Sequence, residues 1–189
     1  KHQNEIKSDC TQIIINHNDL SRISQLSTPQ NVLALCELPN YSQEPISGVN
    51  LVLDGVQDPG NVGSIIRIAD WFSIKSVFCS ANCADAFNPK VIQASMGSIF
   101  RVAIVVQDLM ELLNANKHLS SYAATLHGEP VNGVGKISEG FIIMGNESKG
   151  IGVEIIACSK KHITIPKLGH AESLNVAVAS GIICHALLS

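Results

Sequence analysis

Three short segments of the sequence combine glycines with an amide, a carboxylate or a guanidinium. In residues 53–69 a glycine-rich turn precedes a helical pattern, with Asn61 predicted as the helix cap and Arg67 within the next two turns. A helix start carries free N–H groups and a dipole that favour an anion. The glycines match neither the G-x-G-x-x-G nor the G-K-[ST] nucleotide fingerprint. An ordinary loop with a capping amide and a surface arginine accounts for this segment equally well.

The other two segments lie in the second half of the chain. In residues 144–152, Gly145 directly follows a predicted strand and lets a ligand approach the backbone, and Glu147 supplies a carboxylate. In residues 165–179, Ser173 is predicted as an N-cap, and Asn175 falls in the first turn of an otherwise apolar helix. A buried amide there must find partners. Taken singly, a plain polar turn and a structural amide are the alternatives.

The elements that position these segments alternate between strands and helices. Residues 61–72, 88–100, 108–116 and 173–188 show helical patterns, and the predicted strands are 51–53, 76–79, 102–106, 122–126, 141–144 and 163–165. Apolar strands between helices predict an α/β fold whose mostly parallel sheet has helices on both faces. In such sheets ligands bind beyond the carboxyl ends of the strands. The three segments directly follow predicted strands.

A polar stretch bounded by prolines, residues 38–45, predicts a linker. Before it we expect strands at 12–15 and 32–35, and a helix capped at positions 18–19. So few elements cannot bury both faces of a sheet. We therefore expect residues 1–38 to be the end of an incomplete N-terminal domain, 39–45 a linker and 46–189 a second domain.

Composition limits the class of protein. The 189 residues are 46% hydrophobic, without a run of about 18 apolar residues or a signal-peptide core at the start. We therefore expect a cytoplasmic protein without a membrane segment. The six cysteines lack Cys-x-x-Cys spacing and mostly lie in apolar runs, which predicts buried, reduced thiols. The seven histidines lack metal-ligand spacing, so we expect no metal.

The net charge of −3 argues against a nucleic-acid partner, since phosphate binding usually requires a basic surface. Two explanations remain open if the partner is RNA. A segment upstream of this sequence carries the basic surface, or a local patch suffices. The candidate residues for that patch are Lys149, Lys160, Lys161 and Lys167.

The three segments together resemble the sequence motifs of the SpoU/TrmH RNA methyltransferases. The matching residues are Asn61-x-Gly63-x-x-x-Arg67-x-Ala69, Gly145-Asn146-Glu147-x-x-Gly150, and Ile165-Pro166 with Ser173-Leu174-Asn175-Val176. The resemblance covers about residues 46–189. It implies a SPOUT-type α/β fold with a C-terminal deep trefoil knot, a homodimer, and an L30e-like substrate-binding segment at the N-terminus.

The resemblance also implies a reaction and a cofactor. The family transfers a methyl group from S-adenosylmethionine to a ribose 2′-hydroxyl. Backbone groups around Gly145, Ile165 and Leu174 would hold the cofactor in the knot, and Leu126 and His127, after the preceding strand, would line it. An apolar wall with main-chain hydrogen bonds suits an adenine ring.

The same resemblance assigns catalytic roles. Arg67 is the family's proposed base, but a guanidinium stays protonated in proteins. We therefore expect Arg67 to clamp the target phosphate and stabilise the developing oxyanion, with water or the phosphate as proton acceptor. Asn61 and Asn175 would hold Arg67 and the ribose, and Glu147 would orient Asn61 or Arg67. Ser173 would cap the final helix and touch the substrate.

Two other functions remain as alternatives at this point. One is a catalytically silent RNA-binding relative, which the intact motif residues disfavour. The other is a nucleotide-dependent oxidoreductase, which the missing fingerprint disfavours. Ribosomal and transfer RNA are both targets in the family. The L30e-like resemblance favours ribosomal RNA.

Overall fold

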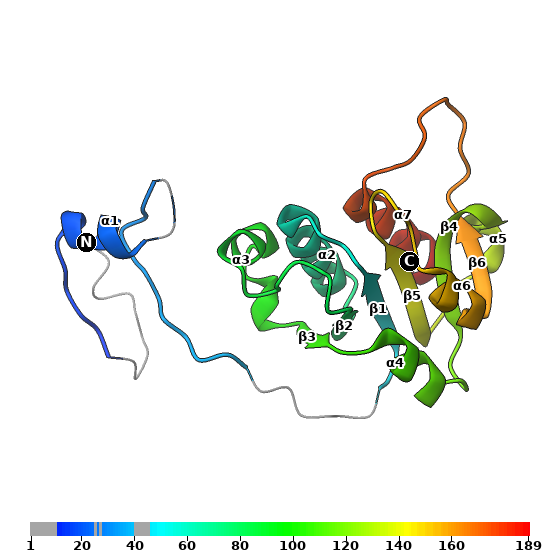
Figure 1. Ribbon diagram of the computed structural model, residues 1–189, viewed down its shortest axis with the longest axis horizontal. Helices are drawn as coiled ribbons and strands as arrows, with labels where there is room; N and C mark the ends of the chain where they lie inside the picture. Colours follow the sequence, from blue (N-terminus) through cyan, green and yellow to red (C-terminus); the bar gives the residue numbers. More distant parts are fainter. Residues whose placement is uncertain (1–10, 25, 27, 40–45) are drawn as a thin grey trace. The chain divides into compact units, whose positions relative to one another are not determined.

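The computed structural model describes residues 11–24, 26, 28–39 and 46–189, and the chain divides into two units, Lys1–Asn40 and Tyr41–Ser189. The first unit contains helix α1 (His17–Ile23), drawn in blue in Figure 1. The side chain of Asn16 caps α1 by accepting from the backbone N–H of Asp19. The predicted cap at positions 18–19 is therefore wrong, because the actual cap lies two to three residues earlier.

The two strands predicted in the first unit are wrong. Residues 12–15 and 32–35 adopt no regular secondary structure, and their side chains are exposed. An apolar run becomes a strand only when a neighbouring strand satisfies its backbone N–H and C=O groups. The described residues of this unit offer no such neighbour.

The second unit is built on one six-stranded sheet in which every pairing is parallel. The strand order is β3-β2-β1-β5-β4-β6, so the predicted α/β fold with a parallel sheet is confirmed. The strands are β1 (Val49–Asp54), β2 (Ser76–Cys79), β3 (Ala103–Val106), β4 (Ser121–Pro130), β5 (Gly140–Gly145) and β6 (Lys161–Thr164).

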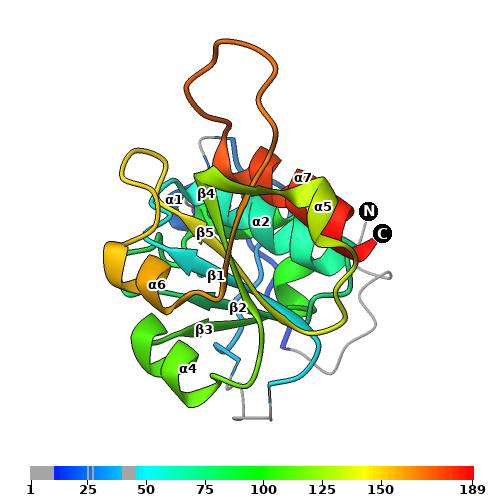
Figure 2. The same ribbon diagram turned by 90° about the vertical axis from the view of Figure 1, so that its right-hand side faces the viewer.

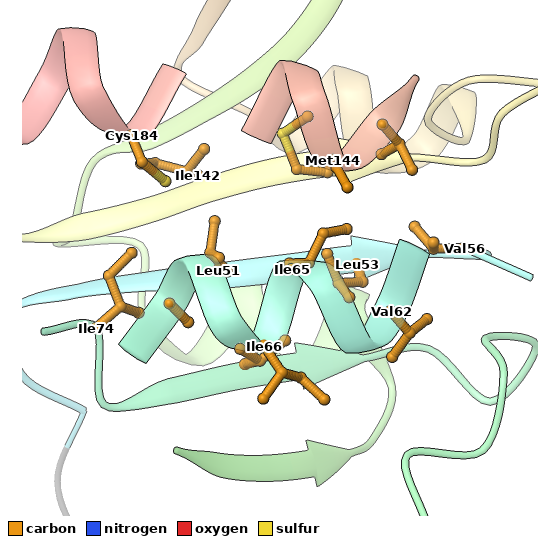
Figure 3. Packing of buried hydrophobic residues seen from close by; sticks show 14 of the residues in the cluster. Leu51, Leu53, Val56, Val62, Ile65, Ile66, Ile74, Ile142, Met144 and Cys184 are labelled. Carbon is orange, nitrogen blue, oxygen red and sulfur yellow. The ribbon is translucent and has the colours of Figure 1, made fainter. Parts of the chain in front are cut away.

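Helices cover both faces of this sheet, as predicted. The central strand β1 alternates, with Leu51 and Leu53 in one apolar cluster and Val52 in the other. Figure 3 shows the first cluster, where Leu51 and Leu53 face α2 and α7. That face carries α2 (Pro59–Trp71), α3 (Pro89–Ser95), α5 (Val131–Val134) and α7 (Val176–Leu188), and the other face carries α4 (Leu109–Ala115) and α6 (Val153–Cys158).

Local backbone chemistry moves several boundaries away from their predicted positions. The cap predicted at Asn61 is wrong. Helix α2 starts at Pro59, because the Asp58 side chain caps it by accepting from the backbone N–H of Asn61 over 2.8 Å. The helix predicted over 88–100 ends at Ser95, because Met96 and Gly97 both take left-handed backbone angles. A 3-10 helix, η1 (Ser98–Phe100), follows. The short helices α5 and α6 have no counterpart among the predictions.

The connection from β6 to α7, residues 165–175, projects from the second unit as the orange loop in Figure 2. All of it from residue 166 onward is exposed. Among the described residues, no helix is both long and apolar enough to cross a bilayer.

Candidate active site at the carboxyl edge of the sheet

Hydrogen bonds join the three motif segments at the carboxyl ends of the strands. The Nδ2 atom of Asn61 donates to Oε1 of Glu147 over 2.9 Å, and Nδ2 of Asn175 donates to Oδ1 of Asn61 over 2.8 Å. Asn61 lies in the first turn of α2, Glu147 follows β5, and Asn175 precedes α7. The prediction that these segments meet at one sheet edge is confirmed.

The order of donors and acceptors in this chain of side chains is fixed at both ends. A carboxylate only accepts, so Asn61 must turn its amide nitrogen toward Glu147. The oxygen of Asn61 then faces Asn175 and accepts from its amide nitrogen. At the other end, Oδ1 of Asn175 accepts from the backbone N–H groups of Ala177 and Val178 at 2.9 and 3.2 Å. Among the described contacts, one hydrogen on each amide and one oxygen of Glu147 have no partner.

The N-cap of α7 is Asn175, so the predicted cap at Ser173 is wrong. Asn175 has the extended backbone of a cap residue, with φ −52° and ψ 136°, and its side chain satisfies two free N–H groups of the first turn. Ser173 lies two residues upstream in the exposed 165–175 loop. Among the described contacts, none involves the Ser173 hydroxyl, and its proposed contact with substrate stays a prediction.

The turn that carries Glu147 is held tightly. The backbones of Asn146 and Gly150 exchange two hydrogen bonds of 2.9 Å. A Cβ on Gly145 would lie 2.4 Å from backbone atoms of Gly150 and Ile151. Gly145 is therefore required for the approach of the chain's own turn, where the sequence had suggested the approach of a ligand.

Arg67 lies apart from the hydrogen-bonded residues. It is six residues beyond Asn61 in α2, which corresponds to roughly 9 Å along the axis and two-thirds of a turn around it. Its side chain is exposed, and within the described parts of the chain no hydrogen bond or ion pair holds its guanidinium. Among the described contacts, Asn61 and Asn175 make no hydrogen bond to Arg67, so their expected hold on it stays a prediction. Glu147 does accept a hydrogen bond from Asn61, the residue it was expected to orient.

The residues expected to hold the cofactor lie around the same edge. Leu126 and His127 belong to β4 itself, at an irregularity where Ala124 and Glu129 both pair with Ile163, so their predicted place after the strand is wrong. The hydroxyl of Thr164 donates to the Leu126 carbonyl over 3.3 Å and ties this irregularity to the end of β6. The fraction exposed is 68% for Leu126 and 49% for Leu174, and Ile165 is half-buried.

A cavity of about 490 Å³ opens at the same edge on the opposite face of the sheet. Its lining includes Asp54, which accepts from the backbone N–H of Gly152 over 2.7 Å, and residues at the starts of α4 and α6. None of the five residues assigned to the cofactor lines this cavity.

The cysteines divide by burial, and two of them lie close to the Gly55 turn. Cys79 and Cys184 are buried as predicted, but Cys36 and Cys158 are exposed, so the prediction of buried thiols holds only in part. A hydrogen bond to Cys83, together with burial, raises the pKa of the Cys79 thiol. The same contact, with further hydrogen bonds from Ser80 and the backbone, lowers the pKa of Cys83 to about 6.

The four lysines suggested as a local basic patch do not form one surface. Lys149 lies in the Glu147 turn and Lys167 follows β6, both at the carboxyl edge of the sheet. Lys160 and Lys161 lie at the opposite end of the four-residue strand β6. There Lys160 donates to the His118 carbonyl, and Lys161 lies over the Tyr122 ring.

Comparisons with known proteins agree with these motifs. Residues 48–185 match the model of the SpoU rRNA Methylase family. A relative from Bacillus subtilis, the 23S rRNA (guanosine(2553)-2′-O)-methyltransferase RlmP, is 32% identical over 92% of this chain and 71% of its own length. Three other curated relatives, from Synechocystis, Archaeoglobus fulgidus and Borreliella burgdorferi, are 26, 29 and 34% identical, and this chain spans 63, 62 and 60% of their length.

Solved structures show the same fold. A TrmH-family protein from Porphyromonas gingivalis superimposes with a TM-score of 0.82 at 39% identity, over 89% of this chain and 70% of that one. The SpoU methyltransferase AviRb from Streptomyces viridochromogenes, solved with AdoMet, superimposes with a TM-score of 0.69 at 26% identity. The match covers 76% of this chain and 60% of that one. The chain therefore belongs to the SpoU/TrmH family of S-adenosylmethionine-dependent RNA ribose 2′-O-methyltransferases.

Proposed function

We propose that this protein transfers a methyl group from S-adenosylmethionine to a ribose 2′-hydroxyl of ribosomal RNA. The observation that carries the proposal is the hydrogen-bonded set Asn61, Glu147 and Asn175 at the carboxyl edge of the sheet. Ribosomal RNA is favoured over transfer RNA because RlmP, similar over 92% of this chain, is named for 23S rRNA.

The cofactor site in this proposal lies among the ends of β4, β5 and β6. The exposed apolar side chains of Leu126 and Leu174 offer the surfaces that an adenine ring requires, and the backbone around Gly145 and Ile165 offers hydrogen-bonding groups. His127 adjoins this group. When bound, S-adenosylmethionine supplies an electrophilic methyl group.

The residues of the chain then act on the RNA. The unused amide hydrogens of Asn61 and Asn175 and the free oxygen of Glu147 position the ribose hydroxyls, so the gain comes chiefly from proximity and orientation. Arg67 contacts the target phosphate and stabilises the negative charge that develops on the 2′-oxygen. Water or the phosphate accepts the proton of the 2′-hydroxyl. Arg67 cannot accept it, because a guanidinium stays protonated in proteins. Ser173 contacts the substrate from the exposed loop.

We also propose a C2 homodimer with each active site near the interface. Helix α7 leaves Val178 and Ile182 exposed at 52% and 39%, and these residues lie one turn apart on one face. Apolar side chains in such a row are typical of a helix packed against a partner. The exposed Arg67 on the neighbouring helix α2 is then available to a site at that interface.

Three further features of the proposal follow the family resemblance. The C-terminal segment threads a deep trefoil knot, which is compatible with the return of the chain from edge strand β6 to pack α7 in the cluster with α2. Residues 1–38 belong to an L30e-like RNA-binding module. The exposed aliphatic side chains within residues 11–38 would pack against the rest of that module. The protein acts in the cytoplasm, without a metal ion.

Two measurements test the proposed function. Calorimetric titration should show binding of S-adenosylmethionine and none of NAD. Tritiated methyl groups should then pass to ribosomal RNA from a strain that lacks the gene, and nuclease mapping should place them on a ribose. Cofactor binding without transfer to ribosomal or transfer RNA would indicate a silent RNA-binding relative instead.

A further inference from the structure

The side chain of Asn146 makes hydrogen bonds at both of its ends. Its Oδ1 atom accepts from the backbone N–H groups of Ser148 and Lys149, each at 2.9 Å. Its Nδ2 atom donates to the Gly55 carbonyl over 2.7 Å, across 91 positions of sequence. These contacts lie immediately before Glu147 in the chain.

The two ends of this amide do different things. The acceptor end closes a local turn, which an aspartate or a serine does as well. The donor end ties that turn to the loop after β1, the loop that leads through Asp58 into α2 and Asn61. The hydrogen bond to the Gly55 carbonyl is not required to form the turn, so it must have another role.

The Gly55 loop therefore fixes both partners of the Glu147–Asn61 hydrogen bond. On one side it continues into α2 and sets the position of Asn61. On the other side it holds Asn146 and thereby the backbone of the next residue, Glu147. The space here is narrow, because a Cβ on Gly55 would lie 3.1 Å from Asn82 and 3.8 Å from the side chain of Asn146.

We propose that Asn146 is a positioning residue for methyl transfer, acting through Glu147. Its amide holds the Glu147 carboxylate within reach of Asn61, and thereby sets the donor and acceptor order of the Asn61–Asn175 pair. This inference rests on the proposed function of the same site. A displacement of about 1 Å at reacting groups lowers a rate by up to about 100-fold, so loss of the tether has a measurable effect.

Two substitutions separate the two ends of the side chain. Asn146→Ala removes all three hydrogen bonds. Asn146→Asp keeps the acceptor for Ser148 and Lys149 but places an oxygen against the Gly55 carbonyl. Both variants should lower kcat on deletion-strain ribosomal RNA by about 10- to 100-fold at saturating S-adenosylmethionine.

The matched control is Asn82→Ala. Asn82 is also an asparagine beside Gly55, and its Oδ1 accepts from the Ser80 hydroxyl over 2.6 Å. Among the described contacts it makes no hydrogen bond to Asn146 or Glu147, and it reaches the Gly55 N–H only through the Ser80 hydroxyl, so its loss should leave kcat within about twofold. A fall in kcat that matches that of Asn146→Ala would show that any disturbance of this loop impairs the enzyme, and would overturn the proposal.

A double-mutant cycle distinguishes positioning from general stability. With Glu147→Ala already in place, Asn146→Ala should lower kcat by less than about twofold further, because its effect passes through the missing carboxylate. An equal fold-loss in both backgrounds would contradict action through Glu147.

A readout besides activity keeps the two proposals separate. The side-chain amide resonances of Asn61 in nitrogen-15 spectra should move in Asn146→Asp and stay in Asn82→Ala. Unmoved Asn61 resonances in Asn146→Asp would overturn the positioning role even in an active enzyme. Conversely, if the wild-type protein transfers no methyl group to any RNA, the proposed function fails while these resonances still report on Asn146.

Discussion

The side chain of Asn175 donates an amide hydrogen to Asn61 over 2.8 Å, while its Oδ1 atom caps helix α7. One side chain thus links the start of the last helix to the start of α2, across 114 positions of sequence. A substitution of Asn175 therefore affects both the contact with Asn61, which uses Nδ2, and the cap of α7, which uses Oδ1.

Asn175→Ala and Asn175→Asp should separate capping from catalysis. The alanine variant loses the cap and should lower the free energy of unfolding by about 1 kcal/mol. The aspartate variant keeps an acceptor for Ala177 and Val178, so its stability should stay close to that of the wild type. Both variants lose the donor to Asn61, and both should lose methyl-transfer activity. Urea denaturation and tritium transfer measure the two effects, and a fully active aspartate variant would show that the donor is dispensable.

Arg67→Ala should abolish methyl transfer while S-adenosylmethionine affinity stays within a few-fold. Because the side chain is exposed and makes no described contact, the free energy of unfolding should change by less than about 0.5 kcal/mol. Arg67→Lys keeps the charge but loses the bidentate fork, and should recover only part of the rate. Calorimetry and single-turnover assays give the comparison. Near-normal turnover in Arg67→Ala would remove this residue from the mechanism.

The two pairs of lysines should differ in their effect on RNA binding. Replacing Lys149 and Lys167 with alanine should weaken binding to ribosomal RNA and reduce the slope of log affinity against log salt by about one to two. Replacing Lys160 and Lys161, at the opposite edge of the sheet, serves as the control and should change neither. Filter binding at several salt concentrations gives both values. An equal slope change in the two double variants would mean that RNA covers both edges.

Ile182→Glu should dissociate the proposed dimer, because it places a charge in the exposed apolar row with Val178. Val153→Glu changes an even more exposed valine, at 81%, on the other face of the sheet, and should leave the dimer intact. Light scattering at micromolar concentration gives the mass of each variant. A monomeric wild-type protein would refute the dimer.

Cys83 should react with iodoacetamide at pH 7 faster than Cys79 or Cys184. The pKa of Cys83 is lowered to about 6, so its thiolate predominates, whereas burial raises the pKa of Cys184 to about 12 and the pKa of Cys79 is also raised. Lowering the pH to 5 should suppress the reaction of Cys83 as its thiolate takes up a proton. Peptide mass spectrometry follows each site, and equal labelling of Cys83 and Cys184 would contradict the assignment.

The sequence by itself determined the class of fold and the edge at which the chemistry lies. Apolar runs such as 51–53 and 141–144 are too hydrophobic to face water on either side, so they had to be buried parallel strands. The motif residues Asn61 and Glu147 follow such strands, and Asn175 follows the shorter strand β6. The carboxyl ends of parallel strands meet at one edge. That meeting follows from chain direction alone.

Only the tertiary structure decided which atoms meet and which residues stand apart. From the sequence, Asn61 was predicted to cap α2 and Ser173 to cap α7. In the structure, side-chain hydrogen bonds make Asp58 the cap of α2 and Asn175 the cap of α7. The strands expected at 12–15 and 32–35 failed because β pairing depends on a neighbouring strand, which no local pattern specifies. The role of Asn146 was likewise hidden, because its Gly55 partner lies 91 positions away and the contact exists only once β1 and β5 pair side by side.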